Sequence, residues 1–282
     1  MLTTPIHKPR SRWAVIGVML VAAVMARETT EAGGLCIRCD SGETVMSQFS
    51  PPPGFSRVSA ADQGFASWLR NLPLLPSDQT ALDWRGNSVF QPGDVAGVLD
   101  WRLLGEVEQC ADVAIRLVAE FMESNGDGDR LTFRSLSGQR IDWSKWLRGN
   151  YGVDDAGAVI EYHPASLRQK SRTEFDRYLT FVMTYANTAS LRDEWMPVED
   201  SVLRAGDVLI QPGCPGSGMG HLSIILDACE DVTGARLYLF ADGYTPARMP
   251  VIRQQVESDP ASAWMTVPEY QALQSQFGIG RF

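Results

Sequence analysis

The sequence predicts an α+β fold in which helices come first and an antiparallel β meander follows. Two observations lead to this prediction. Apolar residues recur at helical spacing in the first two thirds of the folded part, whereas the last third consists of short β-rich runs between glycine and proline turns. A chain of 282 residues, 44% of them hydrophobic, can bury one sizeable core or two small ones.

Three segments are predicted to be helices because their apolar residues recur every three or four positions: 65–72, 110–121 and 171–186. A capping box at 59–62 is expected to start the first helix, which stops before Pro73. A second capping box, Ser171 to Glu174, starts the third. We expect Asn187 to cap the end of that helix.

The predicted strands have the β-branched and aromatic composition of buried strands. Two of them flank the second helix, at 95–101 and 131–136, and four form the meander, at 207–211, 221–228, 236–242 and 250–256. The long polar connection from 149 to 171 is expected to be a surface loop over a site. The run NGDGD at 125–129 lacks the other ligands of a calcium loop and is expected to be a turn.

The N-terminus resembles an export signal. Lys8, Arg10 and Arg12 precede an apolar run from Trp13 to Ala26, which is too short to span a membrane and fits a signal-peptide core. We expect residues 1–26 to be removed near Ala26, or to remain as an N-terminal anchor that would be the only contact with a membrane. Either outcome places the body outside the cytoplasm, in the periplasm, in the medium or on the outer face of a membrane.

The rest of the chain divides into a linker and a folded unit. Residues 27–54 contain EAGG and end in SPPPG, which favours extended chain, and residues 55–282 are expected to form a single α+β domain. The formal net charge is −9, which argues against a nucleic-acid partner because such a partner requires a basic face.

The five cysteines allow more than one disulfide pattern. Export permits disulfides, and an odd number leaves at least one thiol free. Cys36 and Cys39 form a CxxC that favours a local disulfide over a zinc site, since no second pair of ligands follows. Cys214 and Cys229 either pair or both stay reduced. No metal and no cofactor is expected.

Cys110 and His221 are the candidate catalytic pair. Cys110 opens a helix, where free N–H groups and the helix dipole stabilise a thiolate. His221 opens a strand after a glycine-rich turn that leaves room for a substrate backbone. The alternatives are that Cys110 is a small core residue and that His221 is structural. Asp112 would disfavour a thiolate and is expected to face away.

Two further residues complete the candidate site. Asp242 ends the strand next to His221 and is expected to orient the imidazole, unless it merely starts the turn at Gly243. Gln109 and backbone N–H groups near Cys110 are the expected donors to an oxyanion.

Four residues are candidates for substrate contact. Trp143 and Trp146 lie at i and i+3 and could stack on a sugar or an aromatic cell-wall fragment, although anchoring a helix to the core is the favoured alternative. Tyr244 and Arg248 follow Asp242 and either rim the cleft or finish the turn.

Several motifs in order resemble a known family: FASWLRNLPL, QCADVAIRLVAEF, WSKW, FDRYLTFVMTYANTASL, GDVLIQPGCPG, GHLSIILD and YTPAR. They resemble exported bacterial proteins catalogued as domain of unknown function 4846. The resemblance spans about Phe65 to Arg248 and implies export without assigning an activity. Members of that family tend to have a glutamine where Asp242 stands.

A looser resemblance rests on three short motifs. A cysteine at a helix start, a Gly-Asp strand followed by a Gly-His strand, and a polar residue on the next strand are similar to papain-like peptidases and amidases of the NlpC and CHAP kinds. This resemblance implies a papain-like fold with Cys110 as nucleophile, His221 as base and Asp242 as orienting group. The chain has Gln109 where those enzymes usually have an aspartate.

Two functions remain open from the sequence. The first is a secreted thiol hydrolase that acts as an amidase or peptidase on a cell-envelope substrate. The second is a non-catalytic envelope protein that binds glycan or peptide in the same cleft, with Cys110 as a core thiol.

Overall fold

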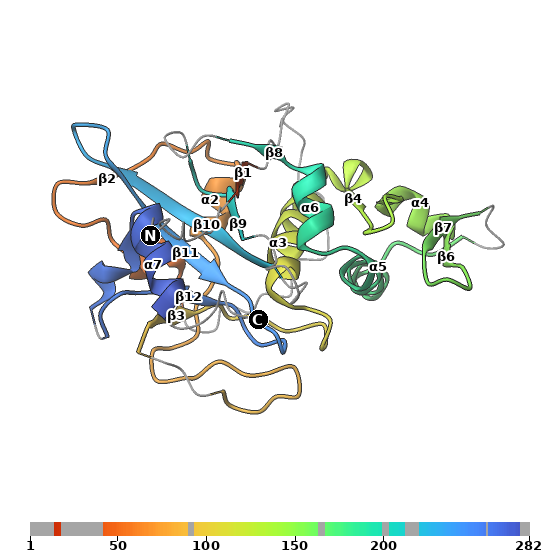
Figure 1. Cartoon of the computed structure of the whole chain (residues 1–282), viewed down its shortest axis with the longest axis horizontal. Coiled ribbons are helices and arrows are strands. Elements are labelled where there is room, and N and C mark those ends of the chain that lie inside the picture. The colour runs from red at the N-terminus through yellow and green to blue at the C-terminus, as the bar shows by residue number, and fades with distance from the viewer. Residues whose placement is uncertain are drawn as a thin grey trace, which may run out of the picture.

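A computed structural model of the chain describes residues 14–17, 42–89, 93–162, 167–198, 203–211, 220–257 and 259–276. Its main feature is an antiparallel sheet, shown in Figure 1. In spatial order the strands are β3 (Val95–Val98), β12 (Val251–Arg253), β11 (Arg236–Asp242), β10 (His221–Glu230), β9 (Val208–Gln211), β1 (Ala14–Gly17) and β8 (Met196–Pro197). Two short strands pair off this path, β2 (Ser56–Arg57) with β10 and β13 (Trp264–Met265) with β11.

Helices cover both faces of this sheet. On one face, α2 (Phe65–Arg70) and the long helix α3 (Cys110–Ser124) pack in the main core with the β10 residues Leu222 and Ile224. On the other face, Tyr270 and Leu273 of α7 (Val267–Gln276) pack with Ile225. Because both faces are covered, β10 is buried from its first residue to its ninth.

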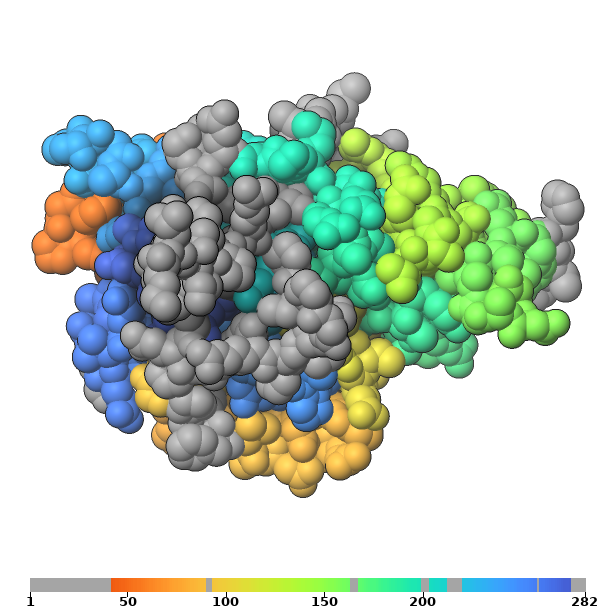
Figure 2. Space-filling model, in the orientation of Figure 1, coloured from red at the N-terminus to blue at the C-terminus, as the bar shows by residue number. Residues whose placement is uncertain are grey.

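A second group of elements extends from α3, away from the sheet. It contains two hairpins and three helices: β4 (Thr132–Arg134) with β5 (Arg140–Asp142), β6 (Tyr151–Val153) with β7 (Val159–Glu161), α4 (Trp143–Leu147), α5 (Arg172–Tyr185) and α6 (Thr188–Glu194). In the space-filling view this group is green, at the end opposite the blue sheet and α7 region (Figure 2). The remaining short elements are α1 (Val45–Gln48) and two 3₁₀ helices, Gly128–Arg130 and Pro260–Ala263.

The predicted order of helices followed by an antiparallel meander is confirmed, since β9, β10, β11 and β12 are neighbours in sequence and in the sheet. The helix and strand segments predicted from periodicity also form close to the expected bounds. Helix α3 is longer than the pattern indicated and is buried on every side from Ala111 to Phe121, because the second group of elements covers the face that the sheet leaves open.

Three local predictions were wrong. Asn187 does not end α5 but starts α6, where its side chain accepts hydrogen bonds from the N–H groups of Ala189 and Ser190. Helix α2 starts after Gly64 with no side-chain cap, so the motif at 59–62 is no capping box. The connection from 149 to 171 is not a plain loop, since β6 and β7 pair within it.

Packed structure also begins earlier than expected. Thr44 caps α1 and forms a bridge with Pro73, and both Val45 and Phe49 are buried in the main core. These apolar residues are four positions apart on one helical turn, so they face the core together. The end of segment 27–54 therefore packs on the domain.

One described strand belongs to the segment that was predicted to be an export signal. β1 lies inside the apolar run predicted as an export signal, and its backbone pairs antiparallel with β9 and β8. Within the described ranges, no helix is long and apolar enough to cross a membrane. Cys36, Cys39 and Cys214 lie outside the described residues.

Candidate functional site

The register of β10 and β11 places His221 beside Asp242. Ser223 is directly opposite Asp242 in the antiparallel pair, and His221 lies two residues before Ser223 on the same face. The His221 Nε2 and the Asp242 Oδ1 are 3.1 Å apart, which is hydrogen-bonding distance. His221 is 7% exposed and Asp242 is fully buried, so water does not compete for this contact.

A glycine lets the end of β11 touch the start of α3. A β-carbon on Gly243 would lie 2.6 Å from Val113 Cγ2 and 3.0 Å from both the Cys110 Cα and the Gln109 carbonyl oxygen. Real β-carbons are not found at the shortest of these distances, so a glycine is needed for this close approach. The contact brings Cys110 next to the strand end that carries Asp242.

Cys110 is the first residue of α3 and is partly exposed, whereas the other cysteine in the described part of the chain, Cys229, is buried. The Cys110 thiol lies close enough to the His221 ring to raise the pKa of that histidine. Since Nε2 of that ring is bound to Asp242, Nδ1 is the nitrogen left for the thiol. The structure therefore brings the three predicted catalytic residues together in the order thiol, imidazole, carboxylate.

His221 and Asp242 hold each other in their charged forms. Burial would lower the pKa of His221, but the hydrogen bond with Asp242 and the contact with Cys110 outweigh it and raise this pKa to about 10. Burial would raise the pKa of Asp242, but His221, Arg253 and Ser223 lower it to about 2. At neutral pH the imidazole is therefore cationic and the carboxyl is ionised.

Asp242 has three partners that sequence reasoning missed. Its Oδ1 accepts hydrogen bonds from the Ser223 hydroxyl at 2.6 Å and from the Tyr270 hydroxyl at 2.5 Å, and its Oδ2 lies 3.5 Å from the Arg253 Nε. Arg253 also pairs with the buried Asp94. Ser223 could have been found from its position two residues after His221, but no local pattern relates Tyr270 to Asp242.

Asp112 was expected to face away from Cys110. It is buried, and its Oδ2 accepts the backbone N–H of Gln109 at 2.9 Å. Burial is the main cause that raises the pKa of this carboxyl to about 8, so it is mostly uncharged at neutral pH. The predicted repulsion of a Cys110 thiolate by Asp112 is therefore weakened.

The Gln109 side chain is held at the same helix start. Its Oε1 accepts a hydrogen bond from the Thr245 hydroxyl at 3.0 Å, and its Nε2 has a long contact of 3.5 Å with the Glu106 carbonyl oxygen. This arrangement leaves the amide N–H₂ as the part of Gln109 best placed to donate to a ligand.

Tyr244 and Arg248 lie beyond the turn that follows Asp242. The Tyr244 hydroxyl accepts a hydrogen bond from Arg253 Nη1 at 2.6 Å, and the Arg248 guanidinium lies 3.2 Å from the centre of the Tyr244 ring. Burial raises the pKa of Tyr244. Both residues are partly exposed and connect the site to the buried Arg253 and Asp94 pair.

Trp143 and Trp146 are not part of this cluster. They are 0% and 6% exposed, and their rings pack against Tyr178 of α5. Trp143 also lies next to Gly128, just beyond the end of α3. That end is about 20 Å from Cys110, given the rise of about 1.5 Å per helical residue. The structure thus gives these tryptophans the core-anchoring position that the sequence analysis favoured.

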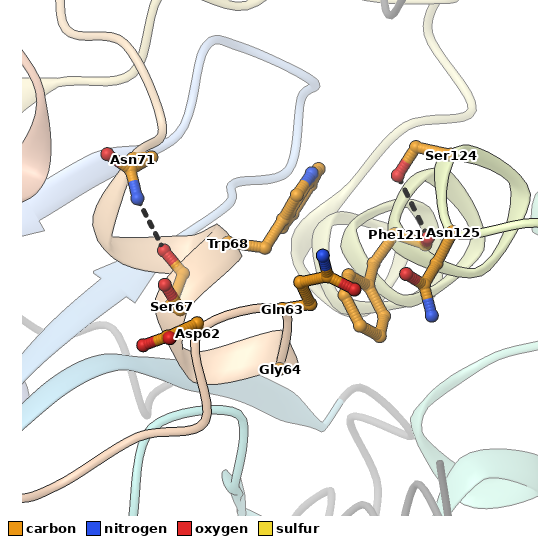
Figure 3. Close-up of a pocket in the computed structure, with 9 residues that line it drawn as sticks. All are labelled: Asp62, Gln63, Gly64, Ser67, Trp68, Asn71, Phe121, Ser124 and Asn125. Carbon is orange, nitrogen blue, oxygen red and sulfur yellow. Dashed lines mark hydrogen bonds between the residues drawn. The ribbon is translucent and has the colours of Figure 1, made fainter. Parts of the chain in front are cut away.

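An open pocket lies at this far end of α3 (Figure 3). Its volume is about 310 Å³, and it runs between α2 and the last turn of α3. The Trp68 ring and the side chains of Gln63 and Asn125 stand around it (Figure 3). It is separate from the Cys110 cluster, and it is lined by Asp62, Gln63, Gly64, Ser67, Trp68, Asn71, Phe121, Ser124 and Asn125.

His163 lies outside the described residues. Across the described ranges, no group of three or more histidine, cysteine, aspartate or glutamate side chains is arranged to hold a metal ion.

Fold and site together define an α+β protein with a cysteine, a histidine and an aspartate clustered at one end of an antiparallel sheet. The model of a family described as domain of unknown function (4846) matches residues 45–277, which is most of the chain, and the protein belongs to that family. No curated protein matches the chain, and no solved structure does either.

Proposed function

We propose that this protein is an exported thiol hydrolase with a papain-like catalytic arrangement, acting as an amidase or peptidase on a cell-envelope substrate. One observation supports this above the others. A partly exposed cysteine at a helix N-terminus lies close enough to a histidine to raise its pKa, and Nε2 of that histidine is hydrogen-bonded to a buried aspartate. A nucleophile, a base and an orienting group in contact are the requirements for covalent acyl transfer.

In the first half of the proposed reaction, the Cys110 sulfur attacks the carbonyl carbon of the substrate amide, and the carbonyl electron pair moves to oxygen. N–H groups at the start of α3 and the Gln109 amide are placed to donate to that oxyanion. The His221 imidazolium then gives its proton to the leaving nitrogen. The C–N bond breaks, and a thioester on Cys110 remains.

In the second half, His221 acts as the base. The thioester carries no charge on sulfur, so the Cys110 contribution to the raised pKa of His221 is lost and the neutral imidazole becomes easier to form. It takes a proton from water, the hydroxide attacks the thioester carbon, and the carboxylic acid product leaves as the thiolate re-forms. Asp242 keeps Nδ1 facing the reacting atoms throughout, because it holds Nε2.

The envelope substrate follows from the sequence. The apolar run after Lys8, Arg10 and Arg12 favours export, and the order of motifs resembles enzymes that cut cell-wall peptides. Substrate contacts are proposed for Tyr244 and Arg248, which are partly exposed just beyond Asp242. Trp143 and Trp146 are left out of this proposal, because buried rings cannot stack on a ligand.

The test compares two thiols in the same protein. Purified peptidoglycan or its peptides are incubated with the full chain, and new amino and carboxyl ends are quantified by mass spectrometry. Cys110→Ala should lower turnover by about 10³-fold or more, because removal of a nucleophile leaves only binding and oxyanion effects. Cys229→Ala removes a buried thiol from β10 and should keep activity. Equal turnover by Cys110→Ala and the parent would refute the hydrolase.

A second candidate function is binding of envelope glycan or peptide without turnover, and the pocket in Figure 3 favours it. A partly exposed indole beside amide side chains is a surface on which a sugar ring can stack and form hydrogen bonds. Loss of glycan binding in Trp68→Ala, with binding kept in Cys110→Ala and no turnover in the parent, would favour this function.

A further inference from the structure

Asp242 receives three hydrogen bonds on one oxygen. Its Oδ1 is 3.1 Å from His221 Nε2, 2.6 Å from the Ser223 hydroxyl and 2.5 Å from the Tyr270 hydroxyl. Ser223 belongs to β10 and Tyr270 to α7, so two separate elements supply donors to the same carboxylate. A carboxylate bound by several donors is stabilised in its charged form.

The two hydroxyl groups could instead satisfy each other. Their oxygens are 2.5 Å apart, and each has a single hydrogen to give. Gln274, one turn after Tyr270 on α7, contacts both hydroxyl groups. Its amide nitrogen donates to the Ser223 oxygen at 3.1 Å and to the Tyr270 oxygen. A charged carboxylate is a stronger acceptor than a neutral hydroxyl, so both hydroxyl hydrogens are directed at Asp242 while both hydroxyl oxygens accept from Gln274.

Burial makes these donors necessary. Ser223, Asp242, Tyr270 and Gln274 all have 0% exposure. Water cannot replace a donor that is removed, and a buried carboxylate without enough donors takes up a proton. A protonated Asp242 would no longer hold the cationic form of His221.

We infer that Ser223, Tyr270 and Gln274 are positioning residues that keep Asp242 ionised and directed at the His221 ring. Their value for catalysis rests on the thiol hydrolase proposed above. Their effect on Asp242 is independent of any substrate and can be measured without one. None of the three touches the reacting atoms, since they act through Asp242 on His221.

The direct readout is the titration of the Asp242 carboxyl carbon by ¹³C NMR in the full chain, with the signal assigned by its loss in Asp242→Asn. Tyr270→Phe removes one hydroxyl and keeps the ring that stacks on Phe240 at 4.0 Å. The titration midpoint should rise by about one pH unit, since a hydrogen bond to a charged group is lost. Ser223→Ala should raise it similarly, and the double variant further.

Tyr178→Phe is the matched control. Tyr178 is also fully buried, and its hydroxyl donates one hydrogen bond, to the Ile141 carbonyl oxygen at 2.8 Å. This variant therefore loses a comparable bond on the α5 side of the molecule and should leave the Asp242 midpoint unchanged. Gln274→Met should raise the Asp242 midpoint by less than Tyr270→Phe does. Both hydroxyl groups remain in this variant, but Gln274 no longer orients them.

Unchanged midpoints in both Tyr270→Phe and Ser223→Ala, or an equal shift in Tyr178→Phe, would overturn the inference. Circular dichroism at each pH confirms that the variants stay folded, and Ser223→Ala serves alone if Tyr270→Phe does not fold. The outcome is separate from that of the proposed function. If Cys110→Ala keeps its turnover, the hydrolase fails, whereas the NMR midpoints still decide whether these residues control Asp242.

Discussion

Gly243 lies so close to Cys110 that a β-carbon on the glycine would sit 3.0 Å from the cysteine Cα. This contact joins the end of β11, which carries Asp242, to the first residue of α3. Any larger residue at position 243 must push the strand end and the helix start apart. The alignment of the thiol with the imidazole therefore depends on a glycine, which has no side chain.

The first prediction concerns this glycine. Gly243→Ala should destabilise the fold by about 1–3 kcal/mol, the usual cost of inserting a methyl group into a packed site. It should also slow the alkylation of Cys110 by iodoacetamide at pH 6, because the thiol moves away from His221. Gly234→Ala, with its β-carbon in open space, tests the cost of a substitution at positive φ alone. Wild-type alkylation in Gly243→Ala would show that the contact is not needed.

The second prediction concerns the charge of Asp242. Asp242→Ala removes the group that raises the pKa of His221, so the imidazolium and the thiolate should both be less populated. Alkylation of Cys110 at pH 6 should slow by about tenfold or more, and Asp242→Asn, which keeps an acceptor for Nε2, should be intermediate. Asp231→Asn, at an exposed turn with local hydrogen bonds, is the control. Equal rates in all variants would contradict the assigned orienting role.

The third prediction is a pH dependence of stability. The pKa of His221 is raised from 6.5 to about 10 in the folded state, so its stabilising contribution is complete below pH 6.5 and is lost as the pH rises through 10. The Asp242 pKa is lowered from 3.8 to about 2, so its contribution is complete above pH 3.8 and is lost as the pH falls through 2.

The difference in unfolding temperature between the parent and His221→Gln should therefore shrink between pH 7 and pH 10. Thermal unfolding followed by circular dichroism measures it, and titrating groups that are not coupled to His221 cancel in the difference. A gap that stays constant over this range would mean that His221 is neutral in the folded protein.

The fourth prediction concerns Glu108, in the segment that precedes α3. Glu108 is fully buried, and it accepts hydrogen bonds from Arg116 at 2.8 Å, from the Trp101 indole at 2.5 Å and from the Leu104 N–H at 2.7 Å. Glu108→Gln should cost about 3 kcal/mol, because it leaves Arg116 short of a buried counter-charge. Glu106→Gln changes an exposed neighbour and should leave the urea midpoint unchanged. A small loss in Glu108→Gln would mean that Glu120 alone compensates Arg116.

Much of the site could be predicted because its three central residues stand at the ends of elements. Cys110 opens a helix, His221 opens a strand and Asp242 closes the next one. Each of these ends is marked in the sequence by a change in the spacing of apolar residues or by a glycine turn. The meander then sets which ends are neighbours. For Trp143 and Trp146 the sequence favoured a core position but left a cleft position open, because an aromatic pair at helical spacing has the same pattern in both.

The environment of Asp242 could not be predicted. Tyr270 and Gln274 reach it from a helix that packs on the same face of the sheet and whose apolar residues, such as Val267 and Tyr270, give only a weak pattern. Arg253 and Asp94 form a buried pair between segments far apart in the chain, and local periodicity carries no information on such a pair. The capping role of Asn187 was missed because a residue between two helices can end one or start the next.

The position of α7 has a consequence for biosynthesis. Tyr270 and Gln274 are later in the chain than every other residue of the cluster, so they leave the ribosome last. A nascent or partly translocated chain that ends before Tyr270 already contains Cys110, His221 and Asp242 but lacks two of the groups that fix the carboxylate. Full thiol reactivity should therefore arise only after synthesis has passed α7.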